Sequence, residues 1–184
     1  MRALTIIPAL VLLFSNSVSL ADDSTITQIR KEYQAIQSAL PTLKMESLAL
    51  YGYSTEGGEA KVYRDAKGNV RLIRVELFEE MGKIFEEYYY QNGSLIFVFY
   101  ERHDYNVPFY VTPEIAKEIG SDESFDGRKT KITEDRYYFN SGKMIRWLND
   151  EKKKVDTKSK EFRETEKQIM DFSNEMLTKV KRKP

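Results

Sequence analysis

The chain has 184 residues, with 29 Lys and Arg side chains, 29 Asp and Glu side chains, one His and no Cys. A protein without cysteine cannot contain a disulfide, an iron–sulfur cluster held by thiolates, a catalytic thiol or an acylated lipoprotein cysteine. The balanced charge gives no electrostatic reason to expect nucleic-acid binding. The length fits one ordinary domain, which is large enough to be stabilised by its apolar core.

The first 21 residues have the features of a cleaved secretory signal peptide. An apolar stretch runs from Ala3 to Phe14, and Ser19 and Ala21 supply the small residues that signal peptidase requires. The stretch is shorter than the roughly 20 residues of a membrane span, which disfavours the alternative of a retained anchor. We therefore expect residues 1–21 to be removed, leaving a single domain over residues 22–184. We expect that domain to be periplasmic or secreted, without a lipid anchor.

The segment from Asp23 to Leu40 is predicted to form an amphipathic helix. It begins with the capping pair Asp23-Ser24 and ends before Pro41, which cannot continue a helix. Its apolar residues recur every three or four positions and define one buried face: Ile26, Ile29, Tyr33, Ile36 and Leu40.

Between Lys44 and Asp150 the apolar pattern changes to a period of two, which is typical of β-strands. Turn sequences with Gly or Asn interrupt this region at short intervals, so consecutive strands should pair antiparallel. The strand Val70–Phe78 alternates apolar and charged residues, which predicts one buried face and one partly solvated face. The strand Ser94–Glu101 is apolar on both faces. We therefore expect it to lie centrally, with a helix, loop or ligand over its second face.

Residues 106–129 interrupt the strand pattern and form the longest excursion of the predicted domain. A short helix over residues 113–119 is expected there, capped by Thr112 and ended by Gly120. Excursions of this size are often functional.

A charged helix is predicted from about Asp156 to Lys181, with an apolar stripe of about 3.5-residue period. We expect it to pack on the sheet, and a short coiled-coil seam for a partner is the alternative. The predicted fold class is therefore α+β. It has an N-terminal helix, an antiparallel meander sheet of about seven strands and a C-terminal helix packed on the sheet.

Three predicted hairpins share an order of aromatic residue, turn, Gly and aliphatic residue. They begin at Val62, Tyr89 and Tyr138, and the turns of the last two contain Asn92-Gly93 and Asn140-Ser141-Gly142. These two copies resemble the Tyr-x-x-Asn-Gly-x-Leu hairpin repeats of the antitoxin-like and MORN-variant families. The resemblance implies an antiparallel meander used for interaction and supplies no catalytic residues. Any meander with such turns and β-forming tyrosines would show the same pattern.

The order of a signal peptide, an amphipathic helix and a meander is also similar to that of the periplasmic lipoprotein-carrier proteins. Their curved sheet holds acyl chains. This architectural likeness implies an apolar or lipid-like ligand as an alternative to a protein partner.

Aromatic residues are concentrated between positions 88 and 110, where nine of 23 residues are Tyr or Phe. No single face of two strands can bury all of them. Tyr combines apolar area with a polar tip, which suits an amphipathic pocket or a protein interface. An alternative is a sheet covered on both faces by the two helices and the excursion. The predicted contact residues for a ligand or partner are Tyr88, Tyr90, Phe97, Phe99, Tyr105, Phe109 and Tyr110.

His103 is the only imidazole, and Glu101 should share its strand face. This pair could form the centre of a hydrolase-type enzyme, whereas Asp104 could orient His103 only if the strand bends. Two ligands are too few for a metal site. We therefore predict that His103 is a surface residue at the end of its strand.

Two acidic pairs flank one predicted hairpin, at Glu79-Glu80 and Glu86-Glu87. They could act as an acid/base couple. We expect instead that they form cross-strand ion pairs with Arg74, Lys83 or Arg71 on the solvated face.

The sequence contains no Gly-x-Ser-x-Gly, phosphate loop, dinucleotide fingerprint or His-Glu-x-x-His motif. We therefore expect a non-enzymatic binding or interaction protein that uses an aromatic-rich antiparallel sheet, without a cofactor or metal. The expected partner is a protein or a small apolar ligand. A carrier or sensor of a lipid-like ligand and a hydrolase centred on His103 are the alternatives.

Overall fold

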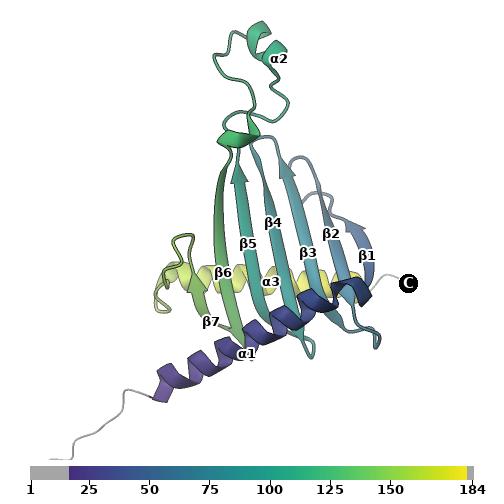
Figure 1. Cartoon of the computed structure of the whole chain (residues 1–184), viewed down its shortest axis with the longest axis vertical. Coiled ribbons are helices and arrows are strands. Elements are labelled where there is room, and N and C mark those ends of the chain that lie inside the picture. Colours follow the sequence, from purple (N-terminus) through teal and green to yellow (C-terminus); the bar gives the residue numbers. More distant parts are fainter. Residues whose placement is uncertain (1–16, 182–184) are drawn as a thin grey trace, which may run out of the picture.

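A computed structural model describes residues 17–181 of the protein. It shows a seven-stranded antiparallel sheet with one long helix on each face (Figure 1). The predicted α+β class is confirmed. The elements are α1 (Ser17–Ala39), β1 (Lys44–Ala49), β2 (Gly58–Arg64), β3 (Val70–Glu79), β4 (Gly82–Gln91), β5 (Ser94–Asp104), α2 (Pro113–Glu118), β6 (Lys131–Asn140), β7 (Lys143–Leu148) and α3 (Lys160–Lys181).

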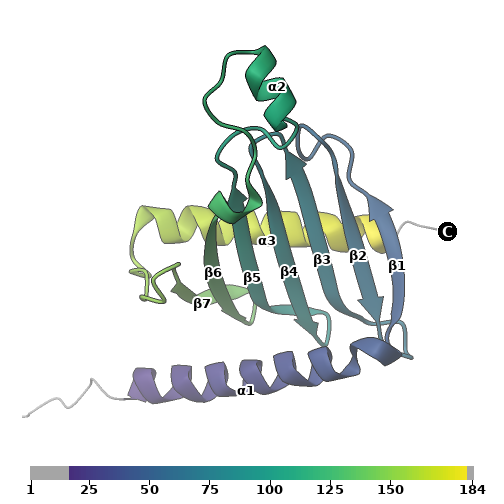
Figure 2. The same ribbon diagram turned by 45° about the horizontal axis from the view of Figure 1, so that its top comes forward.

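The strands follow one another across the sheet in chain order, from β1 to β7. Two-residue turns join β4 to β5 and β6 to β7. Asn92, Gly93, Ser141 and Gly142 all have φ between 51° and 78°, as turns that match the twist of paired strands require. We call the sheet end with these two turns the proximal end. The opposite, distal end carries the β3–β4 turn and the excursion with α2 (Figure 2).

Neighbouring residues of the middle strands face opposite helices, because side chains alternate along a strand. Figure 2 shows the sheet between α1 and α3. The row of paired residues that packs towards α1 is Leu72, Tyr89, Phe97 and Tyr138. The next row, which packs towards α3, is Ile73, Tyr88, Val98, Tyr137 and Trp147. The sheet therefore has two apolar cores, and β5 is covered on both faces as predicted.

The α1 helix begins at Ser17, six residues before the predicted start. A capping role for Asp23-Ser24 was therefore wrong, because the helix continues through both residues. Asp23 instead pairs with Arg146 of β7 at 2.7 Å. The predicted cleavage point after Ala21 falls within α1, and residues 1–16 of the predicted signal peptide lie outside the described residues. Between residues 17 and 181, no helix is long and apolar enough to cross a bilayer.

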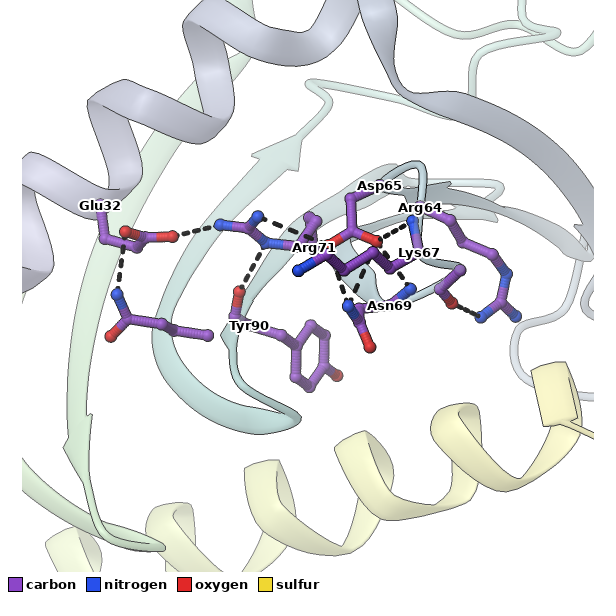
Figure 3. A network of polar contacts seen from close by, with 9 residues as sticks. Glu32, Arg64, Asp65, Lys67, Asn69, Arg71 and Tyr90 are labelled. Atoms are coloured by element: carbon purple, nitrogen blue, oxygen red, sulfur yellow. Dashed lines mark hydrogen bonds and ion pairs between the residues drawn. The ribbon is translucent and has the colours of Figure 1, made fainter.

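Hydrogen bonds fasten both long helices to the β2–β3 hairpin, and Figure 3 shows those on the α1 side. Arg71 donates a hydrogen bond to Glu32 of α1, which also accepts one from Gln91 at 2.9 Å. On the other face, Arg64 donates to the main-chain carbonyl of Val180 at 3.0 Å. That carbonyl belongs to the last turn of α3, where main-chain oxygens lack partners within the helix. One hairpin thus holds a helix on each side of the sheet.

The excursion and the last helix follow the predicted pattern with small shifts. Thr112 caps α2 by accepting a hydrogen bond from the Ile115 main-chain nitrogen at 3.3 Å, as expected. The α3 helix begins at Lys160, later than predicted. Ser159 precedes it and accepts from the Phe162 nitrogen at 3.0 Å, which is the geometry of a helix cap.

The packing of α3 can be tested with two methionines. Met176 of α3 is 1% exposed, and Met45 of β1 is 49% exposed. Replacing Met176 with Ala should lower the free energy of unfolding by about 2–5 kcal/mol, because it leaves a cavity in the core. The matched change Met45→Ala should cost no more than about 0.5 kcal/mol. Urea unfolding of both variants measures this difference, and equal effects would contradict the packing described.

Candidate ligand-binding site

A cavity of about 530 Å³ lies between α3 and the middle of the sheet. We call it the α3 cavity. Strands β3 to β6 form its floor, α3 forms its roof, and the β1–β2 loop contributes one tyrosine. Its lining residues are Tyr53, Leu77, Glu86, Tyr88, Val98, Tyr100, Asp135, Tyr137, Thr165, Gln168, Ile169 and Phe172.

Two carboxyl groups lie on the floor of the α3 cavity. Glu86 of β4 pairs with Tyr100 of β5, which pairs with Asp135 of β6, so all three face α3 in one row. The Tyr88 hydroxyl donates to Glu86 Oε2 at 2.9 Å. The indole nitrogen of Trp147 donates to Asp135 Oδ1, also at 2.9 Å. Each carboxyl is thus oriented by an aromatic side chain from the neighbouring row.

The environment of Glu86 favours its neutral form more than water does. Burial raises the pKa of Glu86 to about 7, and the Tyr88 hydrogen bond opposes this shift. Burial also raises the pKa values of Tyr88 and Tyr137, so both hydroxyls remain protonated at neutral pH. No Lys, Arg or His occurs among the described residues that line the cavity. The carboxyls are therefore not neutralised by a basic lining residue.

The aromatic rings that line the cavity pack against one another. Phe172 of α3 lies 5.4 Å from the Tyr88 ring and 5.9 Å from the Tyr53 ring, measured between centroids. Aromatic faces and carboxylates both attract an organic cation, and the attraction increases when water is excluded. Glu86 can also exchange a proton near neutral pH. The cavity can therefore hold a cationic group inside an otherwise largely aromatic site.

The predicted strand residues of the contact surface lie on two different faces. Tyr88 lines the α3 cavity. Tyr90 is buried beneath α3, where its hydroxyl shares a 2.9 Å hydrogen bond with Ser173. Phe97 and Phe99 point to the opposite face and line a second cavity beside α1. The sheet therefore separates these aromatic residues instead of gathering them.

The other three predicted contact residues, Tyr105, Phe109 and Tyr110, do not line the α3 cavity. Tyr105 packs edge-on against Phe125, with ring centroids 5.1 Å apart. Phe109 and Tyr110 are about half-exposed, at 48% and 46%. A role for these residues in contacting a partner stays a prediction.

His103 and Glu101 share a strand face, as predicted, and lie 2.6 Å apart between Nε2 and Oε1. The His103 side chain is 17% exposed, so it is more enclosed than the surface position we expected. Asp104 bonds to Arg102 at 2.7 Å, on the other side of the strand, and does not orient the imidazole. This pair faces away from the α3 cavity.

For the second acidic pair, the expected partner Arg74 is confirmed for Glu87, which is buried and not on a solvated face, and the expected ion pair is wrong for Glu86. Glu87 accepts from Arg74 at 2.7 Å on the α1 side. Glu86 faces α3, because consecutive residues of a strand point to opposite faces. Arg71 pairs with Glu32 of α1. The alternation of side chains along a strand predicts that Glu86 and Glu87 lie on opposite faces of the sheet. It does not show which face carries a cavity.

Comparison with known proteins gives no relative from which a site could be transferred. No protein-family model, curated protein or solved structure matches this chain. Within residues 17–181, no group of three or more His, Asp or Glu side chains is arranged to hold a metal ion.

The raised pKa of Glu86 predicts a pH-dependent effect on stability. A carboxyl that is protonated more readily in the folded state stabilises the fold at low pH, and this contribution is lost as the pH rises towards 7. As the pH rises from 4 to 8, the free energy of unfolding of Glu86→Gln should therefore increase relative to that of the wild type, by up to about 3 kcal/mol.

Denaturant unfolding of both proteins across this pH range measures the difference. Glu164→Gln, on the exposed side of α3, is the matched control and should show little change with pH. A pH-independent difference for Glu86→Gln would show that Glu86 titrates alike in the folded and unfolded chains.

Proposed function

We propose that this is a non-enzymatic binding protein that holds an organic cation with an apolar body in the α3 cavity. The observation that carries the proposal is Glu86, which lies with Asp135 on a cavity floor surrounded by tyrosines. An isolated carboxylate is costly in such a site, and a bound cation would offset that cost. The sheet and α3 position these groups, so the binding site is largely pre-formed.

The composition of the cavity supports binding of a ligand with two parts. Leu77, Val98 and Ile169 offer apolar contacts, and Phe172 and the tyrosines offer ring faces. An alkyl or aryl body would remove these surfaces from water, at about 25 cal/mol per Å² of apolar area. A quaternary or protonated amine would lie near Glu86, where cation–π attraction adds to the charge pair.

Binding is better supported than catalysis at this site. Nucleophilic catalysis by a hydroxyl group requires a base within reach that activates it. Among the described lining residues, Thr165 is the only aliphatic hydroxyl, and it lies on α3 opposite the carboxyl-bearing floor. Rings and acids without such a pair are typical of sites that recognise cations.

The binding proposal can be tested with decyltrimethylammonium as the probe and the full domain as the protein. Isothermal titration calorimetry at pH 8 should detect binding that weakens as the pH falls below 7, because protonation removes the charge of Glu86. Glu86→Gln should weaken binding by at least about tenfold at pH 8 and have little effect at pH 5.5.

Glu164→Gln is the control for a general loss of negative charge and should bind as the wild type does. Decan-1-ol, which has the same chain without the cation, should bind more weakly than decyltrimethylammonium. Equal affinity of the wild type and Glu86→Gln at pH 8 would overturn the proposed role of this cavity.

We also propose that the protein acts outside the cytoplasm, since residues 1–21 resemble a signal peptide. Cleavage after Ala21 would leave Asp22 as the first residue and retain the buried α1 residues Ile26, Ile29 and Ile36. Mass spectrometry of the exported protein should therefore detect residues 22–184. A mass that includes residues 1–21 would contradict cleavage.

A further inference from the structure

A second cavity, of about 330 Å³, lies between α1 and the sheet. We call it the α1 cavity. Four aromatic side chains line it, and Ile29 of α1 adds an apolar wall. Glu87, Phe99 and Arg136 contribute from the strands, and they directly follow Glu86, Val98 and Asp135 in the sequence. The aromatic lining residues are Tyr33, Phe97, Phe99 and Tyr138.

The acidic residue of the α1 cavity is already neutralised. Glu87 is only 6% exposed, and one of its oxygens accepts from Arg74 at 2.7 Å. The other oxygen accepts from the Tyr89 hydroxyl, which in turn accepts from Gln37 of α1. Glu87 therefore has partners on both oxygens and leaves no carboxylate free to attract a cation.

Arg136 of the α1 cavity retains an unused hydrogen-bond donor. Arg136 donates from Nη2 to Glu134 at 2.6 Å, and its guanidinium lies 5.3 Å from the Phe99 ring centroid. Its Nη1 is shielded from solvent and has no acceptor among residues 17–181. A buried donor without an acceptor costs free energy, so such a group calls for a partner. Arg30 of α1 also lines the cavity and is exposed.

We propose that the α1 cavity binds a carboxylate with an apolar alkyl or aryl body. The guanidinium of Arg136 would supply the donors that match a carboxylate, and Arg30 would add positive charge at the exposed side. The four rings and Ile29 would contact the apolar body. This site is separate from the α3 cavity, because the sheet lies between them and the two linings share no residue.

Isothermal titration calorimetry at pH 8 tests this proposal, with decanoate as the probe and the full domain as the protein. The wild type should bind decanoate more tightly than decan-1-ol, which lacks the carboxylate. Arg136→Gln should weaken decanoate binding by at least about tenfold. Arg128→Gln is the matched control, since Arg128 lies in the excursion and its side chain is 90% exposed. This control should bind as the wild type does.

Two further measurements keep the outcome clear if Arg136→Gln folds poorly. A photoreactive decanoate should label wild-type peptides from α1, β5 and β6, and unlabelled decanoate should prevent the labelling. Decyltrimethylammonium should not compete, because it is expected in the other cavity. Labelling confined to α3, equal binding of decanoate by Arg136→Gln, or equal binding of decan-1-ol would each overturn the proposal.

Discussion

The register that joins β4, β5 and β6 is the constraint on which the rest of this structure depends. It brings Glu86, Tyr100 and Asp135 into one row and places Arg136 with Phe99 in the adjacent row. A shift of one residue would exchange the two faces of every strand involved. The tight turn at Asn92-Gly93 joins β4 to β5, and a register shift between Tyr89 and Tyr90 then sets the pairing at Glu86. The long helices cover both resulting surfaces. The turn and this register shift thus determine which side chains of β4 and β5 share a cavity, and β6 reaches the same row after the excursion.

Much of the fold could be predicted because its signals are local. The turn residues, the apolar run of β5 and the Thr112 cap each act within a few positions, and the structure confirms all three. The start of α1 could not be predicted in the same way. Asp23 and Ser24 are good capping residues, but a helix passes through such residues when the preceding segment also adopts helical geometry. Propensity at one position does not decide where a helix begins.

Far less of the candidate site could be predicted from the sequence. Of the residues predicted to contact a ligand, only Tyr88 lines the α3 cavity. Asp135 and Phe172 lie many positions away along the chain, and they meet Tyr88 only through strand order and the placement of α3. Alternation could have separated Glu86 from Glu87, whereas the choice of face depends on tertiary packing. Sequence patterns therefore identified the aromatic surplus and not its division between two cavities.

The two adjacent rows give the sheet an electrical polarity. Glu86 and Asp135 project towards α3 without a basic partner. Arg74 and Arg136 project towards α1, where Glu87 and Glu134 pair with them, so the acidic charge left unpaired among these residues lies on the α3 side. Backbone dipoles in a sheet largely cancel, and this polarity comes from side chains alone. Covering helices limit the screening by salt. A cation bound beside Glu86 would therefore change the potential on the α1 side, and such a linkage would act equally in both directions.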